Sequence, residues 1–169
     1  NLLLDNKADA NLQNAGGATA LIIAAKNGYA DVVNALLSKG AKVDAQTSDG
    51  ITALMLATQK GHESIVDALL AKNANVNLQT KEKLTALMLA ALDGWTRIAE
   101  KLLARNAQID VQASDNTTAL YMAARNGHTA IVETLLAKNA PVDLLAANDT
   151  TPLYIAAQNG HTEVVNALL

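Results

Sequence analysis

Apolar residues recur along this chain in short runs, each opened by a threonine and closed by a glycine. Thr19, Thr52, Thr85, Thr118 and Thr151 lie 33 residues apart, and a glycine follows each of them nine residues later. A leucine two residues after each threonine and further apolar residues at helical spacing predict one apolar face on a short helix. We expect the threonine to cap the start of this helix and the glycine to end it in a left-handed turn.

A second apolar pattern follows each glycine turn. In the first copy, residues 32, 33, 36 and 37 are Val, Val, Leu and Leu, which places one apolar stripe on a second helix. The residue types that best tolerate a left-handed conformation end this helix in four copies: Gly40, Asn73, Asn106 and Asn139. The polar, turn-rich stretch before the next threonine predicts a hairpin. One repeat is therefore expected to hold two helices and a hairpin within 33 residues.

This pattern resembles the ankyrin repeat. The stretch TPLYIAA at residues 151–157 is similar to the threonine-proline-leucine-histidine-x-alanine signature of that family. The resemblance covers essentially the whole chain and implies an all-α solenoid of stacked helix–turn–helix units with short β-hairpin turns. Proline follows the threonine only at Pro152, and the usual histidine position holds other residues: Ile22, Met55, Met88, Tyr121 and Tyr154. We expect the two methionines and the two tyrosines to lie mainly in the core.

The period also divides the chain into units. A partial repeat is expected at residues 1–13, full repeats at 14–46, 47–79, 80–112 and 113–145, and a second partial repeat at 146–169, together forming one solenoid domain. Neither end shows the polar capping repeat that an isolated solenoid needs. The chain is therefore expected to be part of a longer array.

The composition narrows the function. Aromatic residues make up only 2% of the chain, and the absence of cysteine excludes disulfides and thiol chemistry. A net charge of −3 gives no broad attraction for nucleic acids or acidic membranes, and the apolar stretches are far shorter than the ~18 residues of a membrane span. No signal segment opens the chain, so we expect an intracellular and preferably cytoplasmic location, with a secreted effector as the alternative.

No group of residues points to catalysis. His62, His128 and His161 occupy one repeat position, ten residues after the threonine, and the resemblance implies a structural role for a Gly-His pair at the turn between helices. Repeats stack on the order of 10 Å apart, whereas ligands of a shared zinc lie ~2.0–2.1 Å from the metal. We therefore predict no enzyme activity, no cofactor and no metal.

Three further rows of polar residues recur once per repeat. Basic residues at the ends of the second helices complement the helix dipole, and the alternative is contact with nucleic-acid phosphates: Lys39, Lys72, Arg105 and Lys138. Residues near the hairpin ends are expected to cap turns locally: Asn11, Asp44, Asn77, Asp110 and Asp143. Glutamines on the hairpins are expected to form hydrogen bonds along the stack: Gln13, Gln46, Gln79 and Gln112.

The resemblance implies that a partner protein binds a concave surface made of the hairpin tips and the exposed side of the first helices. Transferred to this sequence, the candidate residues at the tips are Ser48, Asp49, Ile51, Lys81, Glu82, Leu84, Ser114 and Asp115. The candidates near the ends of the first helices are Lys26, Gln59, Lys60, Leu92, Asp93, Trp95, Arg125, Asn126 and Gln158.

Leu92 and Trp95 depart most clearly from the repeat. Leu92 is the only apolar residue seven positions after a threonine, and Trp95 stands where the other copies have Tyr or His. Apolar residues among charged neighbours are typical of interaction hot spots, in which Trp and Arg are enriched. The alternative is that both residues serve packing, and for Trp95 this means filling space at the turn.

The leading hypothesis is a non-catalytic protein-interaction scaffold that binds its partner in the concave groove. A rigid scaffold avoids much of the entropy cost of ordering on binding. The alternative is a regulatory or targeting module of a larger enzyme, channel or effector protein whose active domain lies outside this chain. No nucleic acid and no membrane insertion are expected.

Overall fold

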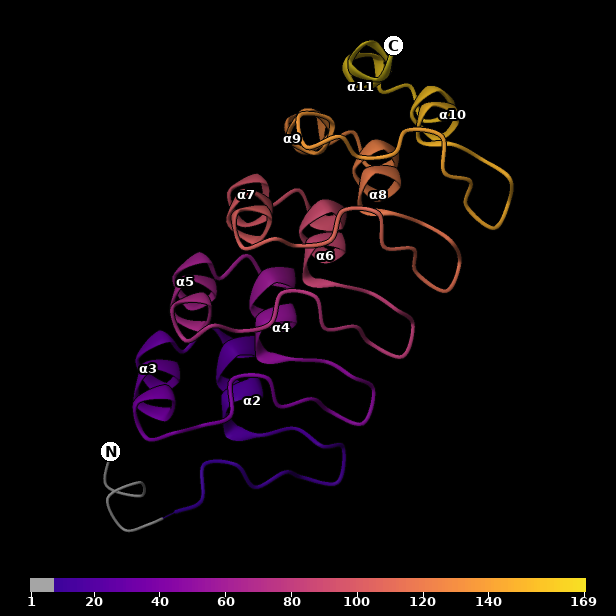
Figure 1. The fold of residues 1–169 in the computed structure, drawn as a ribbon. Coiled ribbons are helices and arrows are strands. Elements are labelled where there is room, and N and C mark those ends of the chain that lie inside the picture. The colour runs from indigo at the N-terminus through magenta and orange to yellow at the C-terminus, as the bar shows by residue number, and fades with distance from the viewer. Residues whose placement is uncertain (1–7) are drawn as a thin grey trace.

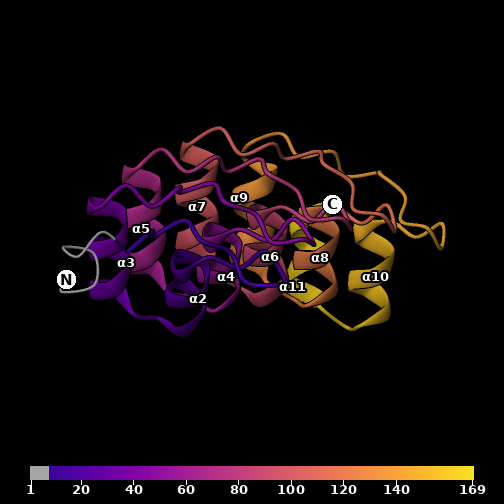
Figure 2. The same cartoon turned by 90° about the horizontal axis from the view of Figure 1, so that it is seen from below.

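The computed structural model describes residues 8–169, in which ten helices form five consecutive pairs (Figure 1). The inner helix of each pair comes first in the chain: α2 (Ala20–Asn27), α4 (Ala53–Gln59), α6 (Ala86–Asp93), α8 (Ala119–Arg125) and α10 (Pro152–Gln158). The outer helix follows: α3 (Ala30–Ser38), α5 (Glu63–Ala71), α7 (Thr96–Ala104), α9 (Thr129–Leu136) and α11 (Thr162–Leu168). Inner helices stack on inner helices and outer on outer, which confirms the predicted all-α solenoid (Figures 1 and 2).

Each helix pair lies within one of the expected repeats, and the first seven residues of the expected partial repeat 1–13 lie outside the described part of the chain. The chain then runs from each outer helix through a long loop to the next inner helix. Figure 1 shows these loops projecting beyond the inner helices, on the side away from the outer helices. This arrangement leaves the loops and the inner helices as one continuous surface.

The threonines cap the inner helices as predicted. Thr52 Oγ1 accepts a hydrogen bond from the backbone N–H of Met55 at 3.1 Å, and the equivalent threonines make the same bond in the other four pairs. In the last pair, Pro152 occupies the first helical turn, where its missing N–H costs no helical hydrogen bond. The side chain that opens each inner helix thus replaces a backbone partner that the helix cannot supply.

The predicted left-handed turns are also confirmed. Gly28, which ends α2, has φ 78°, and the four other glycines of its row have φ between 69° and 81°. The residues that follow the outer helices are left-handed as well, with φ 83° at Gly40 and 57° at Asn73. Both turns let the chain reverse sharply while its backbone N–H groups bond to the helix that has just ended.

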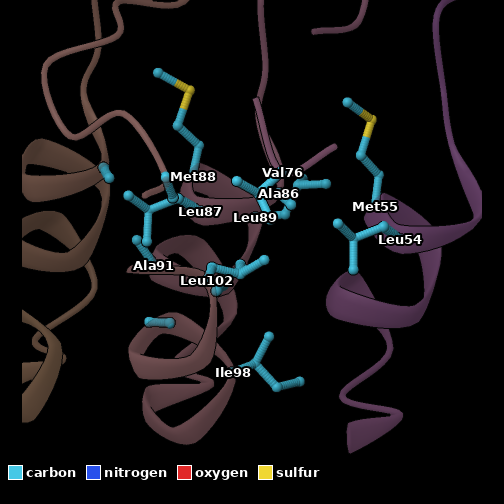
Figure 3. Packing of buried hydrophobic residues seen from close by; sticks show 14 of the residues in the cluster. Leu54, Met55, Val76, Ala86, Leu87, Met88, Leu89, Ala91, Ile98 and Leu102 are labelled. Carbon is cyan, nitrogen blue, oxygen red and sulfur yellow. The ribbon is translucent and has the colours of Figure 1, made fainter. Parts of the chain in front are cut away.

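The core lies between the two rows of helices and between neighbouring pairs. Leu87 of α6 and Ile98 and Leu102 of α7 are fully buried, and Leu54 and Met55 of α4 lie on the adjoining inner helix (Figure 3). Fully burying one such side chain stabilises the fold by ~1.5–3 kcal/mol. Seven alanines of the inner helices are fully buried: Ala25, Ala57, Ala90, Ala91, Ala123, Ala124 and Ala156. Small side chains therefore do much of the packing that aromatic residues do elsewhere.

The loops differ from the predicted β-hairpins because no strand forms within residues 8–169. Each loop ends in a five-residue turn, here called a tip, which two backbone hydrogen bonds close, as from the N–H of Thr47 to the carbonyl of Ile51 at 3.0 Å and from the N–H of Gly50 to the carbonyl of Thr47 at 2.9 Å. Further backbone groups of a tip bond to neighbouring tips or to side chains. The tips are residues 14–18, 47–51, 80–84, 113–117 and 146–150.

The expected core position of Tyr154 is wrong. Met55, Met88 and Tyr121 are buried as expected, whereas Tyr154 is 55% exposed. The hydroxyl of Tyr121 lies 2.9 Å from Thr150 Oγ1, in the tip of the following repeat. Tyr154 belongs to the last described repeat, so no described tip follows to cover it.

The Asn and Asp side chains near the loop ends were expected to cap turns locally, and this interpretation is incomplete. Three of them also accept hydrogen bonds from the next repeat. Asn11 accepts a hydrogen bond from the backbone N–H of Lys42 at 2.7 Å, and Asp44 and Asn77 act in the same way one and two repeats later. Asp110 cannot receive the corresponding bond, because the residue 31 positions later is Pro141, which has no N–H.

The glutamine row follows its prediction where the hydrogen bonds are described. Gln13 donates to the carbonyl of Gln46 at 3.0 Å, and Gln46 donates to that of Gln79 at 3.2 Å. The same amides also donate to Gly17 and Gly50, inside their own tips. Gln13 and Gln46 therefore each join their own tip to the next loop.

Candidate interaction surface

The tips hold their shape through left-handed residues at the same position in all five copies. Gly17, Gly50 and Asn116 have φ between 59° and 80°, and Lys83 and Asp149 both have φ 58°. Glycine and asparagine adopt this conformation readily, whereas a lysine pays a steric cost in it.

Successive tips are joined by backbone hydrogen bonds. The N–H of Ser48 donates to the carbonyl of Gly16 at 2.9 Å, and that of Lys81 donates to Asp49 at the same distance. The bonds from Ser114 to Glu82 and from Ala147 to Asp115 continue the series at 3.0 and 2.8 Å. The tips therefore form one connected edge along the stack, and their side chains project from a fixed backbone.

Hollows open between neighbouring tips. The hollow between the second and third tips has a volume of about 310 Å³ and is lined by Asp49, Ile51, Thr80, Lys81, Glu82 and Leu84. The next, of about 400 Å³, is lined by Glu82, Leu84, Ala113, Ser114 and Asp115. Seven of the predicted partner-binding residues thus line two adjoining hollows, with half-buried Ile51 and Leu84 as the apolar walls.

A third hollow, of about 260 Å³, joins the tips to the inner helices. Asp115 and Arg125, both predicted, line it together with the tip residues Thr117, Ala147 and Asn148. The sequence-based prediction of this surface missed Tyr121 and Ala146, which also line it. Tyr121 was assigned to the core, and its side chain is indeed buried while one edge reaches the hollow. No sequence signal separates a buried tyrosine from one that also lines a surface hollow.

The charged side chains at the rim are partly engaged with one another. The Lys81 ammonium lies 3.3 Å from the Asp49 carboxylate, and both side chains are well exposed, so the pair adds little stability. The hydroxyl of Thr117 donates to the Asp115 carboxylate at 2.6 Å, and this bond lowers the pKa of Asp115, with a smaller contribution from the positive charge of Arg125. Asp115 is therefore a carboxylate over the whole neutral range.

The structure keeps most remaining predicted residues exposed near the ends of the inner helices. Leu92 is half-buried and packs against the core, and it lines none of the three tip hollows. The exposed predicted residues of this group are Lys26, Gln59, Lys60, Asp93, Arg125, Asn126 and Gln158.

Trp95 has a defined packing role at the turn between α6 and α7. Its indole Nε1–H donates to the carbonyl of Gln59 at 3.3 Å, and its ring covers Gly61. His128 and His161 approach Leu92 and Arg125 in the same way, at 3.2 and 3.0 Å, and their rings cover the glycines of the preceding turns. His62 does the same at Lys26 and Gly28. The structural interpretation of the histidines is confirmed, and the packing interpretation of Trp95 is favoured.

Arg105, in the basic row at the outer helix ends, has a structural contact with the preceding repeat. The Arg105 guanidinium donates to the carbonyl of Leu70, at the end of the preceding outer helix. On the same face, Lys101 lies 2.7 Å from both Glu63 and Asp67, and its hydrogen bonds to these carboxylates raise its pKa. Within residues 8–169, no group of three His, Cys, Asp or Glu side chains is placed to hold a metal ion.

The protein-family model described as "Ankyrin repeats (3 copies)" matches residues 1–80 and 87–169 of this chain. The chain belongs to the ankyrin repeat family. Ankyrin repeats are modules for protein–protein interaction and are typically non-catalytic. The comparison with curated proteins gives no match. No helix in the described part of this ankyrin repeat chain is long and apolar enough to cross a membrane.

Proposed function

We propose that this chain is a non-catalytic scaffold that binds a partner protein along the tips and the neighbouring ends of the inner helices. The observation that carries the proposal is the row of hollows between successive tips. Their walls are the apolar side chains of Ile51 and Leu84, and their rims carry Asp49, Glu82 and Asp115. An apolar centre inside a polar rim is the composition of a protein–protein interface.

The backbone of the tips supports this proposal because it is held in place before any partner arrives. Consecutive tips share backbone hydrogen bonds, and Gln13 and Gln46 join their own loops to the loops that follow. A partner would therefore meet preformed hollows, and binding would cost little loop ordering. Affinity would depend on a few side chains in the middle repeats, as is common at interfaces.

The test compares the partners captured by groove variants with those captured by a matched control. Leu84→Arg places a charge in the wall shared by two hollows, and Glu82→Lys reverses an exposed rim charge without touching the core. Ser64→Arg adds a charge to the exposed surface of the outer helix α5. Thermal unfolding establishes that all three variants fold.

Quantitative affinity purification should recover the same partner with the wild type and with Ser64→Arg. Both groove variants should lose it by about tenfold or more, the size of effect expected from a hot spot. Equal recovery with all four proteins would refute binding at the tips, and so would loss confined to Ser64→Arg.

A further inference from the structure

The three middle tips, residues 47–51, 80–84 and 113–117, carry an acidic residue at the same position. The third residue of each is Asp49, Glu82 or Asp115. Backbone hydrogen bonds join these positions to the following tips, from the N–H of Lys81 to the carbonyl of Asp49 at 2.9 Å and from that of Ser114 to Glu82 at 3.0 Å. One carboxylate per repeat therefore follows the middle of the edge, beside the hollows.

The two hollows along this edge differ in charge. The hollow between the second and third tips contains its own cation, because the Lys81 ammonium lies 3.3 Å from the Asp49 carboxylate. The hollow between the third and fourth tips is the larger of the two, at about 400 Å³, and none of its lining residues is a lysine or an arginine: Glu82, Leu84, Ala113, Ser114 and Asp115. Lys83 lines neither hollow. The larger hollow thus combines an apolar wall with two carboxylates and no basic side chain.

The carboxylate of Asp115 is already oriented at this hollow. Thr117 donates its backbone N–H and its hydroxyl to Asp115 Oδ1, at 3.1 and 2.6 Å, so the other oxygen, Oδ2, can accept from a partner. Arg125 meets Asp115 in the third hollow and does not line this one. Glu82 stands on the neighbouring tip with its side chain exposed. The two acids therefore flank the apolar wall from adjacent repeats.

We propose that the hollow between the third and fourth tips takes a lysine or arginine side chain from a linear segment of the partner protein. The aliphatic stem packs on Leu84 and Ala113, and the cation lies between Glu82 and Asp115. This inference rests on the proposed function, whose partner it describes.

Charge complementarity argues for this occupant. Lysine and arginine lay an apolar stem along apolar surface while the charged end remains in a polar environment, which matches the wall and the rim of the hollow. An acidic side chain would be repelled by both carboxylates, and a neutral one would leave them without a partner. A linear segment without a fold of its own is enough to supply one such side chain.

The test uses a displayed library of random linear peptides as the probe. Peptides are selected on the wild-type chain, and those that bind Leu84→Gln about tenfold more weakly or worse are kept, because this change removes the apolar wall without adding a charge. Fluorescence polarisation then compares their affinities for the wild type, Glu82→Gln and Asp115→Asn. Glu133→Gln removes one exposed charge from the outer helix α9 and is the matched control. Circular dichroism and thermal unfolding establish that each variant folds.

The kept peptides should be enriched in lysine or arginine. Glu82→Gln and Asp115→Asn should each weaken their binding by about threefold or more, and the double variant by about tenfold, whereas Glu133→Gln should change nothing. Replacing the basic residue of a peptide by glutamate should abolish binding to the wild type. The same peptide should regain part of its affinity on Glu82→Lys, because the charges are then exchanged.

Peptides that depend on Leu84 but carry no basic residue would overturn the inference, and so would peptides whose affinity either neutral variant leaves unchanged. In both cases binding at the tips would still stand, since it depends on the apolar wall. A library that yields no Leu84-dependent peptide also overturns the inference. The proposed function fails separately, when Leu84→Arg and Glu82→Lys leave the capture of the partner protein unchanged.

Discussion

The indole N–H of Trp95 donates a hydrogen bond to the carbonyl of Gln59 in the preceding repeat, 3.3 Å away, while its ring covers Gly61. Histidines make this contact at the other three interfaces. Tryptophan and histidine therefore fill the same place between stacked repeats, although Trp95 is still 40% exposed.

Replacing Trp95 by His should keep most of the stability of the chain. The imidazole preserves the contact to the Gln59 carbonyl and loses only part of the apolar area, so the free energy of unfolding should fall by less than ~1 kcal/mol. Trp95→Ala removes both and should cost ~1–3 kcal/mol. Urea unfolding of the two variants measures the difference, and equal losses would show that the ring nitrogen contributes nothing.

Leu92→Arg should weaken partner binding with little effect on folding. Arg125 stands at the equivalent position of the next repeat with its side chain exposed, so the backbone there accepts arginine. We expect the free energy of unfolding to change by less than ~1 kcal/mol. Thermal unfolding and partner capture should be measured on the same preparation. A variant that unfolds would assign Leu92 to the core and remove it from the interaction surface.

Lys83→Gly should stabilise the chain. Lys83 has φ 58°, in the left-handed region, where Gly17 and Gly50 stand in other tips. Relief of the left-handed cost of ~1–2 kcal/mol exceeds the entropic cost of glycine, so a net gain of ~0.5–1 kcal/mol is expected. Lys83→Asn is the matched control that keeps a Cβ, and it should gain less. Chemical denaturation measures both, and a loss for the glycine variant would contradict the strain at this tip.

The same substitution by valine should have opposite effects on stability at Thr52, which caps α4, and at Thr58, which lies within α4. Thr52 caps the helix, whereas Thr58 Oγ1 is buried without a hydrogen-bond partner among the described residues. Thr58→Val keeps the shape and removes the unpaired hydroxyl, which should stabilise the fold by ~1 kcal/mol. Thr52→Val removes the cap and should cost ~1 kcal/mol. Differential scanning calorimetry should show midpoints that move in opposite directions; a loss for both would imply that Thr58 has a partner in solution.

Acid should remove the contribution of Asp115 to stability. Its pKa is lowered in the folded chain, so the contribution is fully present above the unfolded-state pKa, near 3.8, and is lost as the pH falls through the folded value. The wild type should therefore lose more stability between pH 5 and pH 2, roughly, than Asp115→Asn does. Thermal unfolding across this range measures the loss.

Thr117→Val tests whether the hydrogen bond from Thr117 lowers the pKa of Asp115, because it leaves the carboxylate in place. It deletes the hydroxyl that donates to Asp115 and should raise the pKa of this carboxyl, measured by its NMR titration. An unchanged pKa would assign the shift to Arg125 and the backbone.

Local features of each repeat were predictable because they depend on neighbours in the chain. Thr52 caps its helix by accepting a hydrogen bond from the backbone N–H three residues later, at Met55. Gly28 and Asn73 take the left-handed turns that their residue types favour. These relationships are fixed by short-range geometry and recur wherever the same spacing recurs.

Contacts between repeats were predictable for the glutamine row but not for most other positions. The bond from Lys42 to Asn11 spans 31 residues, and its existence depends on the rise and rotation from one repeat to the next. Likewise, the exposure of Tyr154 depends on which element follows it in space and not on its own sequence position. The lining of the tip hollows depends on both local turns and contacts between repeats. The sequence therefore predicted Ile51 and Leu84, which lie in the tips, but missed Tyr121, which reaches a hollow from an inner helix.

The rings that cover Gly28, Gly61, Gly94 and Gly127 also bear on how this molecule should respond to force. The extensive helix contacts join only helices of the same repeat or of adjacent repeats, and each ring reaches back by one repeat. Tension applied through the two ends of the described stack would therefore detach repeats one at a time. Stretched in this way, the chain should lengthen in steps of one repeat, and it should recover its shape by adding repeats back onto the part still folded.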